Sequence, residues 1–208
     1  MTLSIYTIKH PLVQHWSSYI LNVTNAKHEQ KNIVSQIFLT LLYESTRKSI
    51  KLINLYINHL GYIKEINLIC NKRPYLIFSE INLIEILGKN IYKFFPEADI
   101  LPFQITNFSK SRQTYIEFGD LSNCCQLNPH IIIIEQYLNL DSMSKIVSSI
   151  KNTKYAIQEI QVICFICSNE ILQIINKTYI NINLTIYTTK IIENSNAKMQ
   201  LYLNKIFI

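Results

Sequence analysis

The sequence predicts an α/β fold in which helices flank a parallel sheet. In the C-terminal half, segments with strand and helix periodicity alternate, which indicates a βαβαβ series with right-handed crossovers. The expected series is strand 131–134, helix 142–151, strand 160–167, helix 169–177 and strand 183–188. Hydrophobic residues make up 49% of the 208-residue chain, and no repeat or Gly/Pro-rich linker divides it. We therefore expect a single domain over residues 1–208 with one packed core.

The N-terminal half begins with a predicted helix over residues 27–46. Its apolar residues recur at helical spacing, which is typical of one buried stripe on a helix of about five turns. Residues 49–70 alternate in a way that fits either strands or a helix, and both alternatives stay open.

The middle of the chain predicts a strand, a helix and a second strand. Residues 75–78 are a short apolar run typical of a buried strand, and a helix over 81–94 ends before Pro96. A strand over 99–106 contains Pro102, which places this strand at a sheet edge or a bulge. The helix residues expected to face the core are Ile84, Leu87, Ile91 and Phe94.

The stretch from Ile131 to Lys145 has the layout of a phosphate-binding turn but lacks glycine. A run of four isoleucines ends at Glu135, a polar turn follows, and a helix is expected to start with Asp141 or Ser142 as its N-cap. At such a helix start, free backbone N–H groups and the helix dipole attract anions. Glycine normally lets the backbone approach the phosphate, yet the whole chain has only 3 glycines. The stretch therefore has the scaffold of a phosphate site but lacks the glycines that let the backbone approach a phosphate.

The formal net charge of +6 suits an anionic ligand, an acidic partner or nucleic acid. The basic residues are scattered, however, and no aromatic-basic motif of the RNA-binding type occurs. A purely solubilising role explains the charge equally well, so RNA is a partner that no motif supports.

Five cysteines without a secretory signal indicate a reducing compartment. Cys164 and Cys167 have CxxC spacing within a predicted central strand, where residues three apart face opposite sides. We therefore expect both to be core residues that share neither a metal nor a disulfide. Cys124 and Cys125 have no second ligand pair nearby, so no zinc site is expected.

No apolar stretch approaches the ~18 residues needed to cross a membrane, and the N-terminus has no apolar signal region. We therefore expect no membrane association. Isoleucine, asparagine, lysine and tyrosine are frequent, and their AT-rich codons suggest a compact genome such as that of an organelle.

Several segments together resemble the uracil phosphoribosyltransferase family, most closely its divergent plastid-encoded homologues. The N-terminal block Lys-His-Pro-Leu-Val-Gln-His at 9–15 is the most specific of them. The resemblance covers nearly the whole chain and is carried by residues 9–15, 41–46, 95–100, 131–134, 185–188 and 205–207. It implies a type I phosphoribosyltransferase fold, a homodimer and a place in the plastid (chloroplast) stroma.

The reaction that this resemblance implies is a glycosyl transfer in pyrimidine salvage. Uracil displaces diphosphate from 5-phosphoribosyl diphosphate (PRPP) to give uridine monophosphate, and Mg²⁺ helps to neutralise the leaving group. Catalysis depends mainly on positioning and electrostatics. We expect no cofactor here, except Mg²⁺ if this reaction survives.

The resemblance also assigns a remnant of the PRPP-binding loop. Glu135 takes the place of the acid that holds the ribose hydroxyls, and residues 139–143 replace the family's Ala-Thr-Gly-Gly-Ser segment. Asp141 then puts a negative charge where a phosphate would sit, which costs on the order of 1–4 kcal/mol. The remnant comprises Glu135, Asn139, Asp141, Ser142 and Ser144.

Two further contacts of the family are altered. The resemblance places Asn82 and Asn107 where the family has diphosphate-binding arginines, and asparagine cannot replace a bidentate guanidinium. Arg73 and Arg112 lie nearby in the sequence and are candidates for compensating phosphate contacts. The segment 192–204, which corresponds to the uracil loop, contains neither glycine nor proline.

Changes at three ligand contacts predict a catalytically impaired or inactive homologue, a pseudoenzyme in which no residue is assigned a catalytic role. PRPP or uracil would bind weakly at most. One alternative is weak salvage activity through Arg73, Arg112 and Glu135. Another is a non-enzymatic regulator, RNA-binding protein or assembly partner on the same scaffold.

Overall fold

The computed structural model describes residues 3–22, 27–69, 74–103, 130–151, 159–180 and 182–193. In chain order its elements are β1 (Ser4–Thr7), α1 (Pro11–Asn22), α2 (Lys27–Thr46), β2 (Leu52–His59), β3 (Tyr62–Ile69), β4 (Pro74–Phe78), α3 (Ile81–Phe94), β5 (Asp99–Pro102), β6 (His130–Tyr137), α4 (Leu140–Lys151), β7 (Glu159–Ser168), α5 (Asn169–Thr178) and β8 (Asn183–Ile192). The predicted helices over 27–46 and 81–94 are confirmed with the same bounds as α2 and α3.

Six strands form one parallel sheet in the order β1-β8-β7-β6-β4-β5. The predicted α/β fold, a parallel sheet flanked by helices, is therefore confirmed. β6 and β7 lie at the centre and are buried on both faces, which explains their continuous apolar runs. β5 is an edge strand that ends at Pro102, as the proline predicted. Residues 104–106 of the predicted strand lie outside the described residues.

The C-terminal series β6-α4-β7-α5-β8 is also confirmed, with each strand longer than predicted. The difference that affects the site is in β6, which continues through Glu135 to Tyr137 because Tyr137 still pairs with Ile166 of the long strand β7. The prediction that the polar turn follows Ile134 and Glu135 directly was therefore wrong. Only two residues separate β6 from α4.

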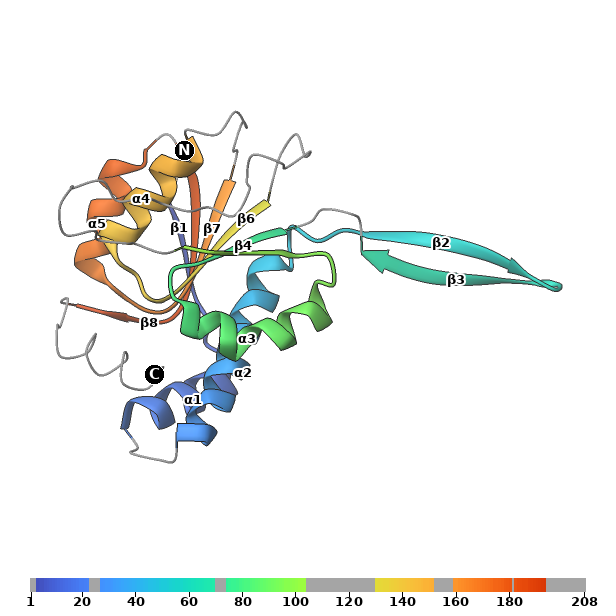
Figure 1. Cartoon of the computed structure of the whole chain (residues 1–208), viewed down its shortest axis with the longest axis horizontal. Coiled ribbons are helices and arrows are strands. Elements are labelled where there is room, and N and C mark those ends of the chain that lie inside the picture. Colours follow the sequence, from blue (N-terminus) through green and yellow to red (C-terminus); the bar gives the residue numbers. More distant parts are fainter. Residues whose placement is uncertain are drawn as a thin grey trace.

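Helices cover both faces of the sheet. In Figure 1, α4 and α5 lie on one face, and α1, α2 and α3 lie on the other. The largest fully buried side chains include Phe38 of α2, Phe78 of β4 and Phe165 of β7, so the core fills the space between these layers. None of the described helices is both long and apolar enough to span a bilayer.

The buried face of α3 differs from the prediction. Ile84 is only partly buried but packs against the core, whereas Phe94 is 44% exposed, so the placement of Phe94 on the core face was wrong. Phe95, the residue that follows the helix, is buried where Phe94 was expected, because the chain leaves the helix axis there. The buried residues of α3 are Leu83, Leu87 and Ile91.

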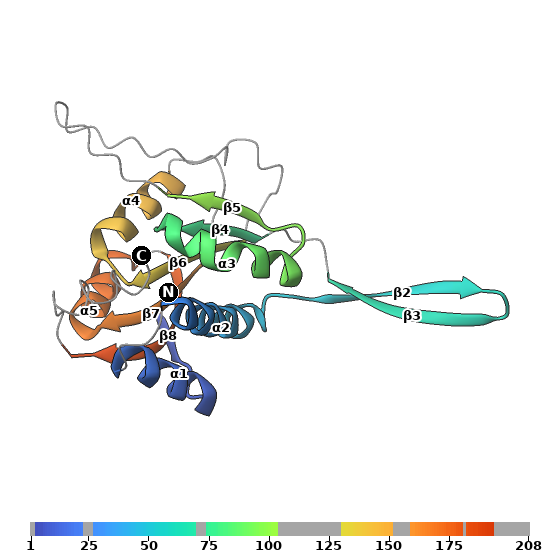
Figure 2. The ribbon, with the colours of Figure 1, turned by 60° about the horizontal axis from the view of Figure 1, so that its bottom comes forward.

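Residues 49–70, which the sequence left open, form the antiparallel pair β2 and β3. Figures 1 and 2 show this hairpin extending away from the sheet. Its tip consists of Leu60 and Gly61, whose φ angles are 31° and 98°. Two positive φ values in a two-residue loop are typical of a type I′ turn, whose twist matches that of the paired strands.

One side of the hairpin is apolar and exposed. Residues directly opposite each other in an antiparallel pair share a face, and side chains alternate between the faces. Ile53 and Leu68, which lie opposite each other, are 51% and 46% exposed. The side that we call the apolar hairpin face carries the aliphatic residues Ile53, Leu55, Ile57, Ile66 and Leu68, with Lys64 opposite Ile57 and the pair His59 and Tyr62 next to the tip. A two-stranded hairpin is marginally stable on its own in water, and most of these aliphatic side chains are exposed to solvent.

Candidate functional site

The candidate site lies at the carboxyl edge of the sheet, where β4, β6, β7 and β8 end. Parallel α/β sheets bind ligands at this edge, because the loops and helix starts that follow the strands meet there. Glu135 and Cys164 are neighbours in register on β6 and β7, and Thr188 of β8 is the next residue along. Paired residues of a parallel sheet point to the same face, so these three side chains are adjacent.

Glu135 connects β6 to the start of α4. Its side chain is 1% exposed. Oε1 accepts a hydrogen bond from the Ser142 hydroxyl at 2.6 Å, and Oε2 accepts one from the Asn139 backbone N–H at 3.1 Å. Both carboxylate oxygens are therefore occupied by the protein's own chain.

Asn139 caps α4. Its Oδ1 accepts a hydrogen bond from the Asp141 backbone N–H at 2.9 Å, and the helix begins at Leu140. The prediction that Asp141 or Ser142 is the N-cap was therefore wrong, because Asn139 takes this role and the helix begins earlier than predicted. Ser142 instead lies inside the first turn, where its hydroxyl reaches back to Glu135.

The five residues of the PRPP-loop remnant separate into two groups. Glu135, Asn139 and Ser142 form the hydrogen-bonded group just described. Asp141 and Ser144 are exposed, and the Ser144 hydroxyl donates to the Asp141 backbone oxygen at 3.0 Å. The segment that replaces the family's glycine loop is thus the first turn of a helix rather than an open loop.

A second acid, Glu80, joins the site, and sequence reasoning missed it. β4 ends at Phe78 and α3 begins at Ile81, so the turn between them consists of Ser79 and Glu80. The Ser79 backbone N–H donates to the Ile134 oxygen at 3.2 Å, which holds this turn against β6. The predicted ends of the strand and the helix were the signal that could have identified Glu80 as a turn residue.

Asn82, which the resemblance placed in a turn, lies instead in the first turn of α3 and is exposed. The turn after β4 consists of Ser79 and Glu80. An acid therefore follows β4, whereas the family resemblance implies an arginine there.

Burial makes the carboxyl groups of Glu80 and Glu135 weaker acids than they are in water. Loss of hydration raises the pKa of Glu135 to about 7, although the hydrogen bonds from Ser142 and Asn139 oppose the change. The charge of nearby Glu80 raises the pKa of Glu135 further. Burial also raises the pKa of Glu80 to about 7. The two groups therefore lose their protons near neutral pH as an interacting pair.

The cysteines of the CxxC segment differ in part from the prediction. Cys164 and Cys167 are fully buried core residues, as expected. The prediction that they face apart was wrong, because their thiols form a hydrogen bond that, together with burial, raises the pKa of Cys164 well above its usual value. Between them lies Phe165, whose backbone oxygen accepts a hydrogen bond from the Thr189 hydroxyl at 2.6 Å.

The basic residues proposed from the sequence for this site, Arg73 and Arg112, lie outside the described residues. The same is true of Asn107, Cys124 and Cys125. Within the described ranges, no lysine or arginine forms an ion pair with Glu80 or Glu135.

A magnesium ion held by the protein does not fit the residues at this edge. In the described part of the chain, no three His, Cys, Asp or Glu side chains converge in a way that could hold a metal ion. Both oxygens of Glu135 already accept hydrogen bonds, and Asp141 is exposed on the outer side of α4. A hard cation needs several oxygen ligands at one point, and the described residues at this edge do not offer them.

No family model matches the chain. A curated protein from Porphyra purpurea, called uracil phosphoribosyltransferase homolog, is 24% identical over 214 residues, and the match covers 100% of both chains. The predicted resemblance to the uracil phosphoribosyltransferase family is thereby confirmed. The chain is thus a homologue of a protein with that name over its whole length.

A solved structure with a similar fold supports the architecture of this chain. The AQ2163 protein from Aquifex aeolicus matches with a TM-score of 0.70 at 16% identity, over 93% of this chain and 90% of that chain. Hypoxanthine phosphoribosyltransferase from Trypanosoma cruzi, in complex with the product IMP, matches at 0.42 with 10% identity over 82% and 79%. Purine phosphoribosyltransferase from Pyrococcus horikoshii matches at 0.43 with 10% identity over 95% and 97%. The shared fold rests on the Aquifex protein, because the other two scores are too low.

Glu135→Gln is expected to raise the free energy of unfolding at pH 8 and to flatten its pH dependence. Because the pKa of Glu135 is raised to about 7, the folded protein keeps a proton that the unfolded chain loses at a lower pH. Stability therefore falls as the pH rises from about 4.5 to about 7. The buried charge costs about 3 kcal/mol above this window. An amide avoids that cost, and the loss of one of the two accepted hydrogen bonds offsets about 1 kcal/mol of the gain.

Urea unfolding at about pH 5 and about pH 8 measures this difference. Glu85→Gln, an exposed change on α3, is the matched control and is expected to leave the pH dependence unchanged. If Glu135→Gln is no more stable than the wild type at the higher pH, the buried carboxylate is not the source of the pH dependence.

Ser142→Ala is expected to destabilise the fold by about 1–3 kcal/mol, because it removes a buried hydrogen bond to a carboxylate. Ser144→Ala, on the same helix, removes an exposed bond to a backbone oxygen and is expected to change stability by less than about 0.5 kcal/mol. Equilibrium unfolding of both variants gives the comparison. Equal effects would show that the contact between Ser142 and Glu135 does not hold the start of α4.

Proposed function

We propose that this uracil phosphoribosyltransferase homologue has lost the transfer of the phosphoribosyl group while retaining the scaffold. The observation that carries the proposal is the closed arrangement around Glu135, both of whose oxygens accept hydrogen bonds from the start of α4. In the family that the chain resembles, an acid at this place holds the ribose hydroxyls of PRPP. A buried carboxylate that is bonded to its own chain is not available to a sugar.

The backbone amides at the same place support the proposal. A phosphate at a helix start is held by N–H groups that have no partner within the helix. Here the Asn139 N–H is donated to Glu135, and the Asp141 N–H is donated to the Asn139 side chain. A phosphate would have to displace both side-chain oxygens before it could bind there.

The charges at the edge also oppose a polyanionic ligand. Glu80 and Glu135 lie at the ends of neighbouring strands, and each is an anion when deprotonated. Repulsion between an ionised carboxylate and a nearby phosphate costs on the order of 1–4 kcal/mol, which corresponds to about one to three decades of affinity. An acid at Glu80 removes the attraction that an arginine supplies at the corresponding turn of the family.

PRPP with Mg²⁺ is therefore expected to give no micromolar binding in isothermal titration calorimetry near pH 7.5. Glu80→Gln combined with Glu135→Gln is expected to restore part of the affinity, since it removes two charges and leaves the side-chain shapes in place. Micromolar binding to the unmodified chain would contradict the loss of the PRPP site.

Weak salvage activity is the competing enzymatic outcome. It would appear as formation of uridine monophosphate from uracil and PRPP that Glu135→Ala abolishes, with Arg73 and Arg112 as the groups that hold the phosphates. Activity that survives Glu135→Ala points to a contaminating enzyme instead. A complete absence of product agrees with the proposed pseudoenzyme.

A role in assembly is favoured by the hairpin. The apolar hairpin face exposes a row of aliphatic side chains on an element that extends from the sheet (Figure 2). We infer that a second copy of the chain covers this face, which gives the homodimer expected from the family resemblance. The other outcomes of a test are a monomer or an assembly that does not depend on the hairpin.

Ile53→Lys combined with Leu68→Lys is expected to convert the dimer to a monomer, because two charges enter the apolar hairpin face side by side. Asn54→Lys combined with Asn67→Lys, the adjacent pair on the other face, is the matched control and is expected to stay dimeric. Light scattering distinguishes the dimer from the 24.4 kDa chain. Dimers in both variants would exclude the hairpin face as the interface.

Binding of RNA and a location in the plastid stroma are further inferences. The net charge of +6 supports RNA binding, which would have to weaken steeply with salt. The plastid location is supported by the homologue from Porphyra purpurea and by the residue usage of the chain. Detection of the protein outside isolated plastids would contradict it.

A further inference from the structure

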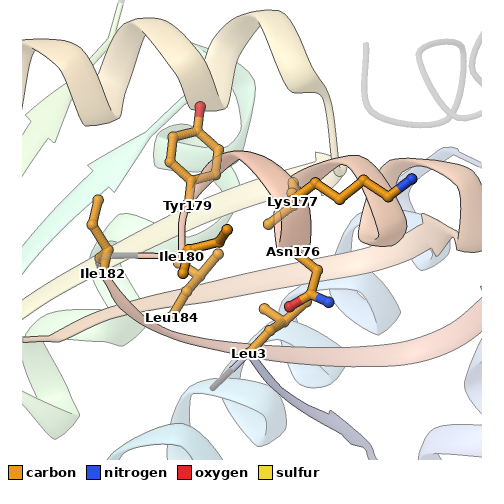
Figure 3. A pocket seen from close by; sticks show the side chains of 8 residues that line it. Leu3, Asn176, Lys177, Tyr179, Ile180, Ile182 and Leu184 are labelled. Carbon is orange, nitrogen blue, oxygen red and sulfur yellow. The ribbon is translucent and has the colours of Figure 1, made fainter. Parts of the chain in front are cut away.

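A second candidate binding site lies at the opposite end of the sheet from Glu135. A cavity of about 280 Å³ opens between the last turn of α5, the segment that follows it, and the starts of β1 and β8. Figure 3 shows the side chains that line it, which are Leu3, Ile175, Asn176, Lys177, Tyr179, Ile180, Ile182 and Leu184. Its size is near the lower end of small-molecule sites in proteins.

The floor of this cavity is part of the hydrophobic core. Ile175 and Leu184 are 0% and 2% exposed, and Leu3 and Ile182 pack against the core from its edge. Water on such a floor finds few hydrogen-bond partners, so an apolar group that replaces it gains free energy. The floor therefore suits the apolar body of a ligand.

The mouth of the cavity is polar and carries one positive charge. Figure 3 shows the Lys177 ammonium and the Tyr179 hydroxyl at the outer ends of their side chains, away from the apolar floor. Among the described residues that line the cavity, none is an aspartate or glutamate. The Tyr179 hydroxyl is protonated at neutral pH and can donate a hydrogen bond; partial burial raises the pKa of Tyr179 further.

Lys177 also determines which charge the cavity accepts. It lies in the last turn of α5, where the helix dipole places partial negative charge. Without the ammonium group, the backbone oxygens of that turn would repel an anion. With it, the mouth attracts an anion through a charge-assisted hydrogen bond.

We propose that this cavity binds a small amphipathic carboxylate, with its apolar body on the floor and its acid group at Lys177. Ile180 at the mouth is 62% exposed, which leaves an apolar surface for a longer chain to cover. The cavity lies at the other end of the sheet from the PRPP-loop remnant, so this proposal stands independently of the loss of transferase activity.

Octanoate is the probe, and calorimetry on the full chain measures its affinity. Lys177→Met keeps the length of the side chain and removes its charge, so it is expected to weaken octanoate about tenfold. Ile180→Glu, which adds a negative charge at an exposed position, is expected to weaken it in the same direction. Neutral 1-octanol is expected to bind Lys177→Met within about twofold of the wild type, since it carries no charge.

Lys89→Met is the matched control, because Lys89 is an exposed helical lysine on α3. It is expected to leave octanoate binding unchanged. In methyl spectra of isoleucine-labelled protein, octanoate is expected to shift Ile175, Ile180 and Ile182. The proposal is overturned by an absence of binding, by equal loss in Lys177→Met and Lys89→Met, or by shifts confined to the hairpin isoleucines.

Discussion

The hydrogen bonds between Glu135 and the start of α4 determine what the carboxyl edge of the sheet can do. The Glu135 carboxylate accepts hydrogen bonds from the Ser142 hydroxyl and the Asn139 backbone N–H. The Asn139 side chain accepts one from the Asp141 backbone N–H. Each contact is local, yet together they use the groups that a helix start normally offers to an anion. The site is closed by the same chemistry that would have bound a phosphate, with a carboxylate from the chain in place of the ligand. A glycine loop would leave these groups free, but here the helix begins too early for one.

The cost of this closure is electrostatic. A buried carboxylate without a cation is stable only if its environment supplies hydrogen bonds or a proton, and Glu135 has both available. Glu80 on the neighbouring strand end adds repulsion when both groups are ionised. Hydrogen bonds from Ser142 and Asn139 favour the anion, whereas burial and Glu80 favour the protonated form. The edge therefore changes its charge near neutral pH by binding protons, and this makes the local stability of the start of α4 depend on pH.

Elements defined by local patterns could be predicted from the sequence, whereas contacts that depend on the order of strands in the sheet could not. The apolar stripes and Pro96 define α2 and α3, and the isoleucine run identifies β6. Asn139, Asp141 and Ser142 are all good N-cap residues close together in the sequence, and in the structure Asn139 caps α4. The role of Glu80 depends on β4 and β6 being neighbours, which no short segment reveals. The contact between the two cysteine thiols was missed because the pattern assumes ideal alternation along β7.

The distribution of apolar surface supports a role for the chain outside this edge. Around Glu135 the polar groups are paired and buried, so a new ligand there has to replace contacts already present. The hairpin presents the opposite case, because its eight strand pairs hold an apolar face away from the core. Exposed aliphatic rows weaken solubility unless another surface covers them, and a two-stranded element gains little stability alone. A partner that covers the hairpin face therefore gains binding free energy, whereas a ligand at the carboxyl edge first has to break existing hydrogen bonds. This contrast supports the proposed role in assembly.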